Sequence, residues 1–291
     1  MNTIISKASI LCVASAVMLS LSACGGSGAS TTVSSDCTPK HSDISTVKTG
    51  TLTVGVIDYP PFSSYNDGKP DGIDISIVKK IAADDCLEVS WQPATYADAI
   101  TSIAQGNLDI ATGSIAVTED RMKAVDFSSS LYVEAMGITT KAGAKTIEEV
   151  RDMDGKVGTV DGYMTNADLE KIFGDRLISY PSPVELKADF DAGRLIADFE
   201  TYAVAALQFK GNSDVTVVPA TGDVGEDFGS LNNPAEDGFP LTKGNASLKT
   251  AISDGIKAQQ ADGSLGKLLE AVGLSADLAK VSSEQYVVPA S

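Results

Sequence analysis

Arg121 is the residue whose surroundings most strongly suggest a defined chemistry. It closes the run T-E-D-R that begins at Thr118, a residue type preferred at helix N-caps, and the two acids between them suit the positive end of a helix dipole. The preceding turn, around Ser114, is rich in backbone N–H groups. A guanidinium beside such donors can hold a carboxylate through two parallel charge-assisted hydrogen bonds. The segment therefore predicts a carboxylate site; the alternative is a surface salt bridge from Arg121 to Asp120 or Asp126.

Few other residues have the spacing of a catalytic or metal site. The only histidine, His41, has no cysteine or carboxylate at ligand spacing, so we expect it to be exposed to solvent. Asp74 stands at the start of a predicted helix and is interpreted as a capping carboxylate. No nucleophile–histidine pair and no zinc-type cysteine spacing is present. We therefore expect no cofactor, no metal and no catalytic residue.

The charge of the chain limits its partners. Its 291 residues carry 22 basic and 39 acidic side chains, a formal net charge of −17. No basic patch is available to meet phosphates, which argues against a role in binding nucleic acid. The length is sufficient for two ordinary hydrophobic cores.

The segments around Arg121 alternate between strands and helices. Apolar periodicity predicts a strand over 50–57 and a helix over 73–84. A second strand over 89–92 is followed by a helix that ends at Gly106. This rhythm is typical of a parallel sheet with helices on both faces, which binds ligands beyond the carboxyl ends of its strands.

Five motifs, in one order and at matching spacing, carry a specific resemblance. They are G-T-L-T-V-G-V-I-D-Y-P-P-F (50–62), D-G-I-D-I-S-I-V-K-K-I-A (71–82), A-I-T-S-I-A-Q-G-N-L-D-I (99–110), T-E-D-R (118–121) and V-D-F-S (125–128). Together they resemble the first lobe of the extracellular solute-binding proteins of family 3, which bind polar amino acids and serve ABC importers. The resemblance implies an α/β fold of the type II periplasmic-binding-protein kind, with two lobes joined by two crossover strands.

The resemblance also implies a ligand site between the lobes. Arg121, with backbone N–H groups near Ser114 and Ala116, would take a carboxylate. Tyr59 and Tyr96 would sandwich the body of the solute. The alternative for both tyrosines is that they serve only in packing.

The second lobe departs from the family pattern in two places. Tyr163–Met164 replaces small hydroxyl residues that usually help to hold the ligand carboxylate, so that only Thr165 offers a hydroxyl. Thr201 stands where an aspartate usually meets the α-ammonium group. Its neighbour Glu200 could take this role through a one-residue bulge, whereas a regular strand would point it the other way, together with Asp198. We therefore expect Glu200 or Asp198 to bind a positive group of the ligand.

The matches also set the lobe boundaries. We expect lobe 1 to span 48–135 and 236–291 and lobe 2 to span 136–235. One crossover is placed near 133–140. The segment 238–245 resembles the family's strand back into the first lobe.

The first 23 residues resemble a lipoprotein signal peptide. One lysine precedes an apolar run over 8–21, and L-S-A-C, ending at Cys24, resembles a lipobox, which implies a diacylglyceryl group on that cysteine. The alternative is an ordinary signal peptide with an incidental cysteine. Residues 24–47 are expected to form the lipid anchor and a flexible tether rich in Gly, Ser and Thr.

Two further cysteines, Cys37 and Cys86, belong to the body of the protein. An exported protein meets oxidising conditions, so we expect a disulfide that pins the N-terminal segment to the first lobe. The alternative is two unpaired thiols.

These features predict a lipid-anchored monomer on the extracytoplasmic side of the cell membrane. It would capture an amino acid or a related small carboxylate and deliver it to an ABC permease, without enzymatic activity. Two alternatives use the same fold: a secreted dehydratase-like enzyme, for which Glu200 is the candidate general acid or base, and a solute-sensing subunit.

Overall fold

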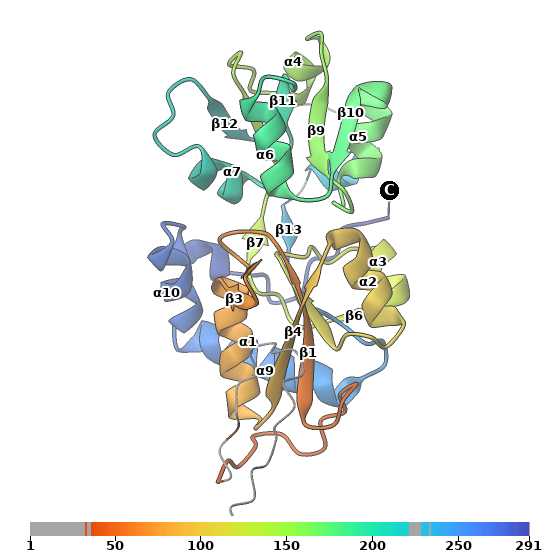
Figure 1. Ribbon diagram of the computed structural model, residues 1–291, viewed down its shortest axis with the longest axis vertical. Helices are drawn as coiled ribbons and strands as arrows, with labels where there is room; N and C mark the ends of the chain where they lie inside the picture. Colours follow the sequence, from red (N-terminus) through yellow and green to blue (C-terminus); the bar gives the residue numbers. More distant parts are fainter. Residues whose placement is uncertain (1–32, 34–35, 221–227, 233, 291) are drawn as a thin grey trace, which may run out of the picture.

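The computed structural model describes residue 33 and residues 36–220, 228–232 and 234–290, and it consists of two α/β lobes joined end to end (Figure 1). The predicted two-lobe α/β architecture is thereby confirmed. The predicted signal peptide and Cys24 lie outside the described residues. Within the described part of the chain, every helix is too short or too polar to cross a bilayer.

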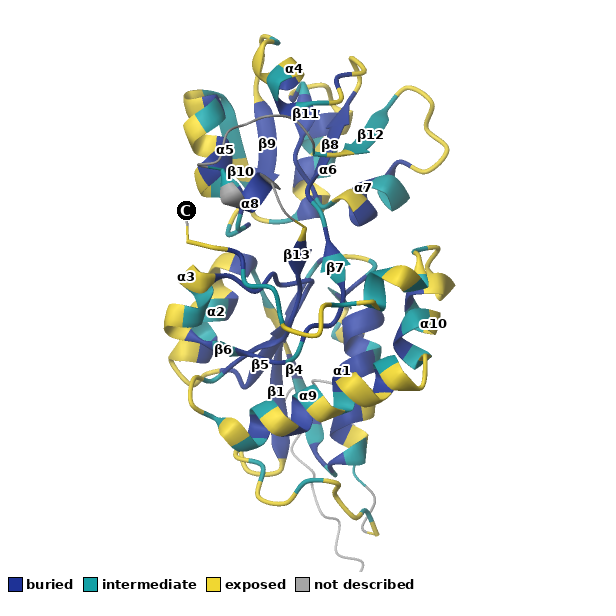
Figure 2. Cartoon of the chain, turned by 180° about the vertical axis from the view of Figure 1, so that it is seen from behind, coloured by how far each residue is buried: buried dark blue, intermediate teal, exposed yellow. Residues whose placement is uncertain are grey.

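The first lobe contains a sheet with the strand order β4-β1-β5-β14-β6. Its strands are β1 (Thr51–Ile57), β4 (Glu88–Ala94), β5 (Ile110–Thr112), β6 (Asp126–Phe127) and β14 (Pro240–Leu241), and a separate hairpin consists of β2 (Ser64–Asn66) and β3 (Lys69–Asp71). Its helices are α1 (Ile73–Asp84), α2 (Tyr96–Ala104), α3 (Glu119–Ala124), α9 (Ala246–Ala261) and α10 (Ser264–Ala271). Helices α1, α9 and α10 lie on one side of the sheet and α2 and α3 on the other (Figures 1 and 2). The interior strand β1 is parallel to its neighbours β4 and β5 and is buried along its whole length, as expected for a strand covered on both faces.

The second lobe contains a sheet with the strand order β10-β9-β11-β8-β12. Its strands are β8 (Gly137–Thr140), β9 (Val157–Val160), β10 (Leu177–Tyr180), β11 (Ala197–Asp198) and β12 (Thr216–Pro219). Its helices are α4 (Ile147–Arg151), α5 (Asn166–Phe173), α6 (Pro183–Asp191), α7 (Tyr202–Gln208) and α8 (Gly229–Asn232), with a 3-10 turn at Gly174–Arg176. Strand β9 is parallel to β10 and β11, whereas β8 is antiparallel to β11 and β12.

Two short strands cross between the lobes (Figure 1). They are β7 (Val133–Glu134) and β13 (Ala235–Glu236), and they pair antiparallel with each other. The lobe boundary expected at 135/136 falls just after β7, and the one expected at 235/236 falls within β13. Residues of both crossovers therefore lie next to each other where the lobes meet.

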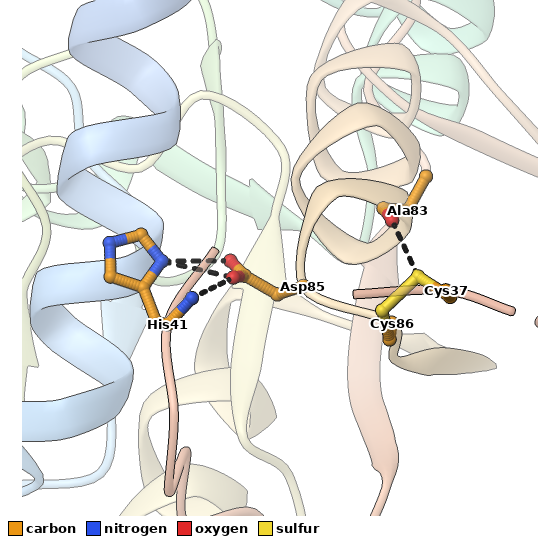
Figure 3. The surroundings of a disulfide bond; sticks show 5 residues. All are labelled: Cys37, His41, Ala83, Asp85 and Cys86. Atoms are coloured by element: carbon orange, nitrogen blue, oxygen red, sulfur yellow. Dashed lines mark hydrogen bonds and ion pairs between the residues drawn. A yellow bond between two sulfur atoms is a disulfide. The ribbon is translucent and has the colours of Figure 1, made fainter. Parts of the chain in front are cut away.

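The N-terminal segment is clamped to the first lobe (Figure 3). Cys37 and Cys86 form a disulfide beside the end of α1. His41 is not exposed in the way that the sequence suggested, because its Nδ1 lies 3.0 Å from Asp85 Oδ1 and its Nε2 lies 3.4 Å from Asp254 Oδ2. The expectation was wrong because these partners stand 44 and 213 residues away along the chain, outside any local spacing.

The C-terminal segment returns to the first lobe after α10 and a 3-10 turn (Ala276–Ala279). Val288 N donates to Val117 O and Val288 O accepts from Glu119 N, both at 2.9 Å. The buried side chain of Val288 packs in one small cluster with Ala116, one of the predicted site residues. The end of the chain thus lies close to the junction of the lobes (Figure 1).

Candidate ligand-binding site

A cavity of about 40 Å³ lies between the two lobes. Both lobes and both crossovers contribute to its lining, which consists of Tyr96, Ser114, Ala116, Arg121, Glu134, Ala135, Met136, Tyr163, Met164, Thr165, Thr201, Ala235 and Asp237. All the predicted ligand-binding residues except Tyr59 and Glu200 are among them. A volume of this size admits about two or three water molecules. An amino acid can therefore enter only if the lobes separate.

Arg121 borders the cavity and contacts both lobes. Thr118 caps α3 as predicted, since its Oγ1 accepts a hydrogen bond from Arg121 N at 3.1 Å. The guanidinium donates from Nη1 to Ala116 O at 2.8 Å, and from Nη2 to Gly162 O of the second lobe at 2.7 Å. Among the described residues the alternative pairing with Asp120 is not observed, because that carboxylate pairs with a lysine of the same helix at 2.5 Å. A guanidinium has five N–H donors, so others remain for a ligand carboxylate.

The turn before α3 does not offer the main-chain donor predicted at Ser114. Gly113 N and Ser114 N both donate to Asp74 Oδ2, at 2.8 and 3.3 Å, and Tyr132 OH donates to Asp74 Oδ1 at 2.7 Å. Burial raises the pKa of Asp74 to about 6, although these three donors act in the opposite direction. Asp74 does not cap its own helix, whose N-cap is Gly72 without a side-chain hydrogen bond. It braces the turn, a role hidden from the sequence because the contact to Gly113 spans 39 residues.

Two buried carboxylates from the crossovers face the cavity. Glu134 ends β7 and Asp237 follows β13, and their exposed fractions are 6% and 1%. Ser114 Oγ is hydrogen-bonded to Glu134 Oε2 and to Asp237 Oδ2. Burial raises the pKa of Asp237 to about 7, and burial together with the charge of Asp237 raises the pKa of Glu134 well above its usual value. This pair makes one side of the cavity acidic.

Three tyrosines from the two lobes contact one another beside the cavity. The ring of Tyr96 is edge-on to Tyr59 at a centroid distance of 5.8 Å and to Tyr163 at 5.1 Å. Tyr59 also stacks on Phe62 at 5.7 Å. No solute fits between Tyr59 and Tyr96 in this conformation, so the predicted sandwich would require these rings to move apart.

Glu200 lies behind the aromatic rings and does not reach the cavity lining. Its Oε1 accepts hydrogen bonds from Tyr163 OH at 2.7 Å, Tyr59 OH at 3.1 Å and Thr201 N at 2.7 Å. Its Oε2 has no hydrogen-bond partner among the described residues, and burial raises its pKa to about 7. Tyr59 belongs to the first lobe, so its contacts with Glu200 and Thr201 Oγ1 join the lobes. Asp198, the other predicted acid, is buried in β11 and also lies outside the cavity lining.

Thr165 supplies a buried hydroxyl from the second lobe. It precedes the first residue of α5 without making a side-chain capping bond. Its Oγ1 has no hydrogen-bond partner within the described residues, although the residue lines the cavity. A buried hydroxyl left in this state costs about 1–3 kcal/mol, which a ligand acceptor would offset.

The sequence reasoning missed Glu134, Asp237 and Tyr163 as site residues. A signal for Glu134 was present, because it is an acidic residue within the crossover placed near 133–140. Tyr163 was noted only as a departure from small hydroxyl residues. Asp237 had no local signal, since its partner Ser114 stands 123 residues earlier.

Known proteins are similar to this chain in sequence and fold. The family model for bacterial extracellular solute-binding proteins, family 3, matches residues 52–274. The L-cystine-binding protein TcyJ of Escherichia coli (strain K12) is 29% identical over 227 residues, which cover 76% of this chain and 82% of the relative. A solved structure of an ancestral arginine-binding protein bound to arginine is 27% identical, with a TM-score of 0.66 and coverage of 77% of this chain and 98% of that one. The ancestral amino acid-binding protein AncCDT-1, a precursor of cyclohexadienyl dehydratase, is 26% identical, with a TM-score of 0.65 and coverage of 76% and 94%.

The family match extends over both lobes and both crossovers. It starts in β1 and ends just after α10, so that the C-terminal segment with Val288 lies beyond it. The chain therefore belongs to the bacterial extracellular solute-binding proteins of family 3, the amino-acid-binding proteins of ABC transporters, and has their type II periplasmic-binding fold.

Proposed function

We propose that this protein binds an amino acid, or a related small carboxylate, between its two lobes and delivers it to an ABC permease. The observation that carries the proposal is that one cavity is lined both by Arg121 from the first lobe and by Thr165 from the second, whose hydroxyl has no partner among the described residues. A carboxylate that accepts from both groups would be a ligand contact to both lobes. Such a ligand stabilises the closed form, which the permease recognises.

The proposal includes no enzymatic step. The only acid considered for general acid–base catalysis, Glu200, is engaged by three donors through one oxygen and lies behind Tyr163. A general acid or base must come within hydrogen-bond reach of the reacting atoms. The likeness to a precursor of a dehydratase is matched by likeness to amino-acid-binding proteins. A solute-sensing subunit would use the same site with a different membrane partner.

The carboxylate clamp is tested by a binding screen. The purified protein is heated with each common L-amino acid, L-cystine and simple carboxylic acids, and a ligand of the folded state raises the unfolding temperature. The dissociation constant of the best ligand is then measured by calorimetry. Arg121→Ala is expected to weaken binding at least about 30-fold, because it removes the cation of a buried charge pair.

Lys123→Ala is the matched control, because Lys123 is an exposed cation on the same helix. It is expected to leave the dissociation constant unchanged. Uptake of the same ligand by cells lacking the chain should be restored by the wild type and not by Arg121→Ala. Retention of full affinity in Arg121→Ala would contradict the proposed clamp.

We also propose that Cys24 carries a lipid that holds the protein on the extracytoplasmic face of the cell membrane. Replacement Cys24→Ser is expected to move the protein from the membrane fraction to the soluble extracytoplasmic fraction and to abolish incorporation of labelled fatty acid. Cys37, which forms a disulfide in the body of the protein, offers the contrasting variant, since Cys37→Ser should leave the labelling intact. An unlabelled wild-type protein would refute the anchor.

A further inference from the structure

The acidic side of the cavity is made by residues of the two crossovers. Glu134 lies opposite Ala235 in the antiparallel pair β7–β13, and Asp237 forms an isolated bridge with Ala116. This backbone arrangement brings both carboxylates onto Ser114 Oγ. The backbone of both acids is thus fixed by pairing with neighbouring main chain, which determines where their carboxylates lie.

The hydroxyl of Ser114 cannot donate a hydrogen bond to the carboxylates of Glu134 and Asp237 at the same time. A serine hydroxyl has a single proton and can donate it to only one acceptor at a time. Two carboxylates that share one site cannot both be ionised unless a positive group compensates them. One of the two acids must therefore hold a proton, or both must meet a cation.

No cation of the described residues pairs directly with either acid. Among the described residues, no salt bridge involves Glu134 or Asp237, and the nearest cation, Arg121, uses Nη1 and Nη2 for the carbonyls of Ala116 and Gly162. Glu134 Oε1 lacks a hydrogen-bond partner within the described part of the chain, although the residue is 6% exposed and lines the cavity. A buried acceptor without a partner, on a residue that lines the cavity, indicates that the ligand provides the hydrogen-bond donor.

We propose that Glu134 and Asp237 form the binding site for a primary ammonium group of the ligand, in place of the second-lobe position occupied by Thr201. This inference rests on the proposed function and specifies its ligand as a zwitterion. A primary ammonium has three N–H donors, which match Glu134 Oε1, Asp237 and the lone pairs of Ser114 Oγ. A quaternary ammonium has none and would leave these acceptors unsatisfied. A metal ion is a poorer fit, because no cluster of three metal-ligating side chains occurs among the described residues.

The location of the site fits a single small zwitterion. Arg121 and the two acids line one cavity, so a carboxylate and an ammonium on neighbouring atoms can reach both. Met136 and Met164 are among the residues that line the same cavity and can contact the apolar part of the solute. Methionine side chains adapt their shape to different apolar groups.

The test compares variants that retain the shape of the side chains. For the best amino acid from the screen, dissociation constants are measured with the wild type, Glu134→Gln, Asp237→Asn and the double variant. One remaining carboxylate can still accept from an ammonium, so each single change is expected to weaken binding about tenfold and the double change about 100-fold or more. Both changes replace a buried acid with a neutral side chain of the same shape, so the variants avoid the cost of burying a charge and are expected to fold.

Asp161→Asn is the charge-matched control, because Asp161 is exposed at a neighbouring surface pocket. It is expected to change the dissociation constant by no more than about threefold. If the double variant keeps its affinity while Arg121→Ala loses it, the ammonium site is refuted and the proposed function stands. Binding only of carboxylic acids without an amino group would also refute the ammonium site. If neither an amino acid nor a carboxylic acid binds the wild type, both proposals fail.

Proton competition provides a second readout. The ammonium and the shared proton occupy the same acceptors, and burial raises the pKa of both acids, so the wild-type affinity is expected to rise with pH, by up to about tenfold per pH unit, until the pair has lost its shared proton, and then to level off. The other groups facing the pair are Arg121, which stays charged, and four tyrosines whose raised pKa values keep them neutral, namely Tyr59, Tyr96, Tyr132 and Tyr163. Asp74, behind Ser114, and Glu200, behind Tyr163, are the nearest other acids. If the ligand affinity of the double variant does not change with pH, the result supports the ammonium site. If its affinity rises with pH as steeply as that of the wild type, the titration belongs to Asp74 or Glu200 and the ammonium site is overturned.

Discussion

At the scale of single residues, Thr165 has a buried hydroxyl for which the described part of the chain provides no hydrogen-bond partner. The same second-lobe region contains Thr159, whose Oγ1 donates to Asn166 Oδ1 at 2.9 Å. The two threonines are equally buried and differ only in whether the protein itself supplies the hydrogen-bond partner. They therefore allow ligand binding to be separated from folding.

Replacing Thr165 with Val is expected to leave the free energy of unfolding unchanged or to raise it by up to about 1 kcal/mol, because a buried unsatisfied hydroxyl is removed. Ligand affinity should fall about tenfold, the value of one hydrogen bond to a charged carboxylate. Thr159→Val should do the reverse, with about 1 kcal/mol lost in urea denaturation and little change in affinity. A similar loss of stability in both variants would show that Thr165 does not serve the ligand.

Local sequence predicted some site residues and not others, for a physical reason. Arg121 stands one turn after a helix cap, and both the cap and the turn are encoded by adjacent residues. Ser114 and Asp237 meet only because β13 returns to the first lobe, and their separation of 123 residues carries no periodic signal. Asp74 was misread for the same reason, since a carboxylate at a helix start resembles a cap until its distant partners are known.

At the scale of elements, the strands and helices that could be predicted from the sequence are the long ones, such as β1 and α1. The strand expected over 50–57 is β1, and the helix expected over 73–84 coincides with α1, because their apolar periods run over several residues. Strands β7, β13 and β14 have two residues each, too few to show any period. Those short strands carry or adjoin the acidic side of the cavity, so the least predictable elements position the chemistry.

At the scale of the whole molecule, the lobes are held together by contacts that a ligand must replace or accommodate. Arg121 reaches Gly162, Tyr59 reaches Glu200, and the ring of Tyr96 meets that of Tyr163. The small cavity shows that these contacts describe a fully closed form. These contacts between the lobes must therefore break before a ligand enters, and the measured affinity will include the free energy of that opening.

The phenol of Tyr59 offers a direct test of closure. Tyr59→Phe removes a hydrogen bond between the lobes, which should shift the equilibrium of the ligand-free protein toward the open form about tenfold. The radius of gyration from small-angle X-ray scattering should then increase. Tyr163→Phe removes a bond to the same Glu200 oxygen but within the second lobe, so the radius should stay unchanged. An equal increase in both variants would mean that the packing around Glu200, and not the bridge between lobes, controls closure.

The clamp at the N-terminal segment determines where a pulling force would act on the molecule. The disulfide joins Cys37 to Cys86, between α1 and β4, at the end of the first sheet opposite the cavity. Tension arriving along the preceding chain would pass through this covalent link and the His41–Asp85 contact into the base of one lobe. Neither crossover strand lies on that route. A protein held by its N-terminal end can therefore be dragged or tilted by its attachment while the opening and closing of its lobes proceeds mechanically undisturbed.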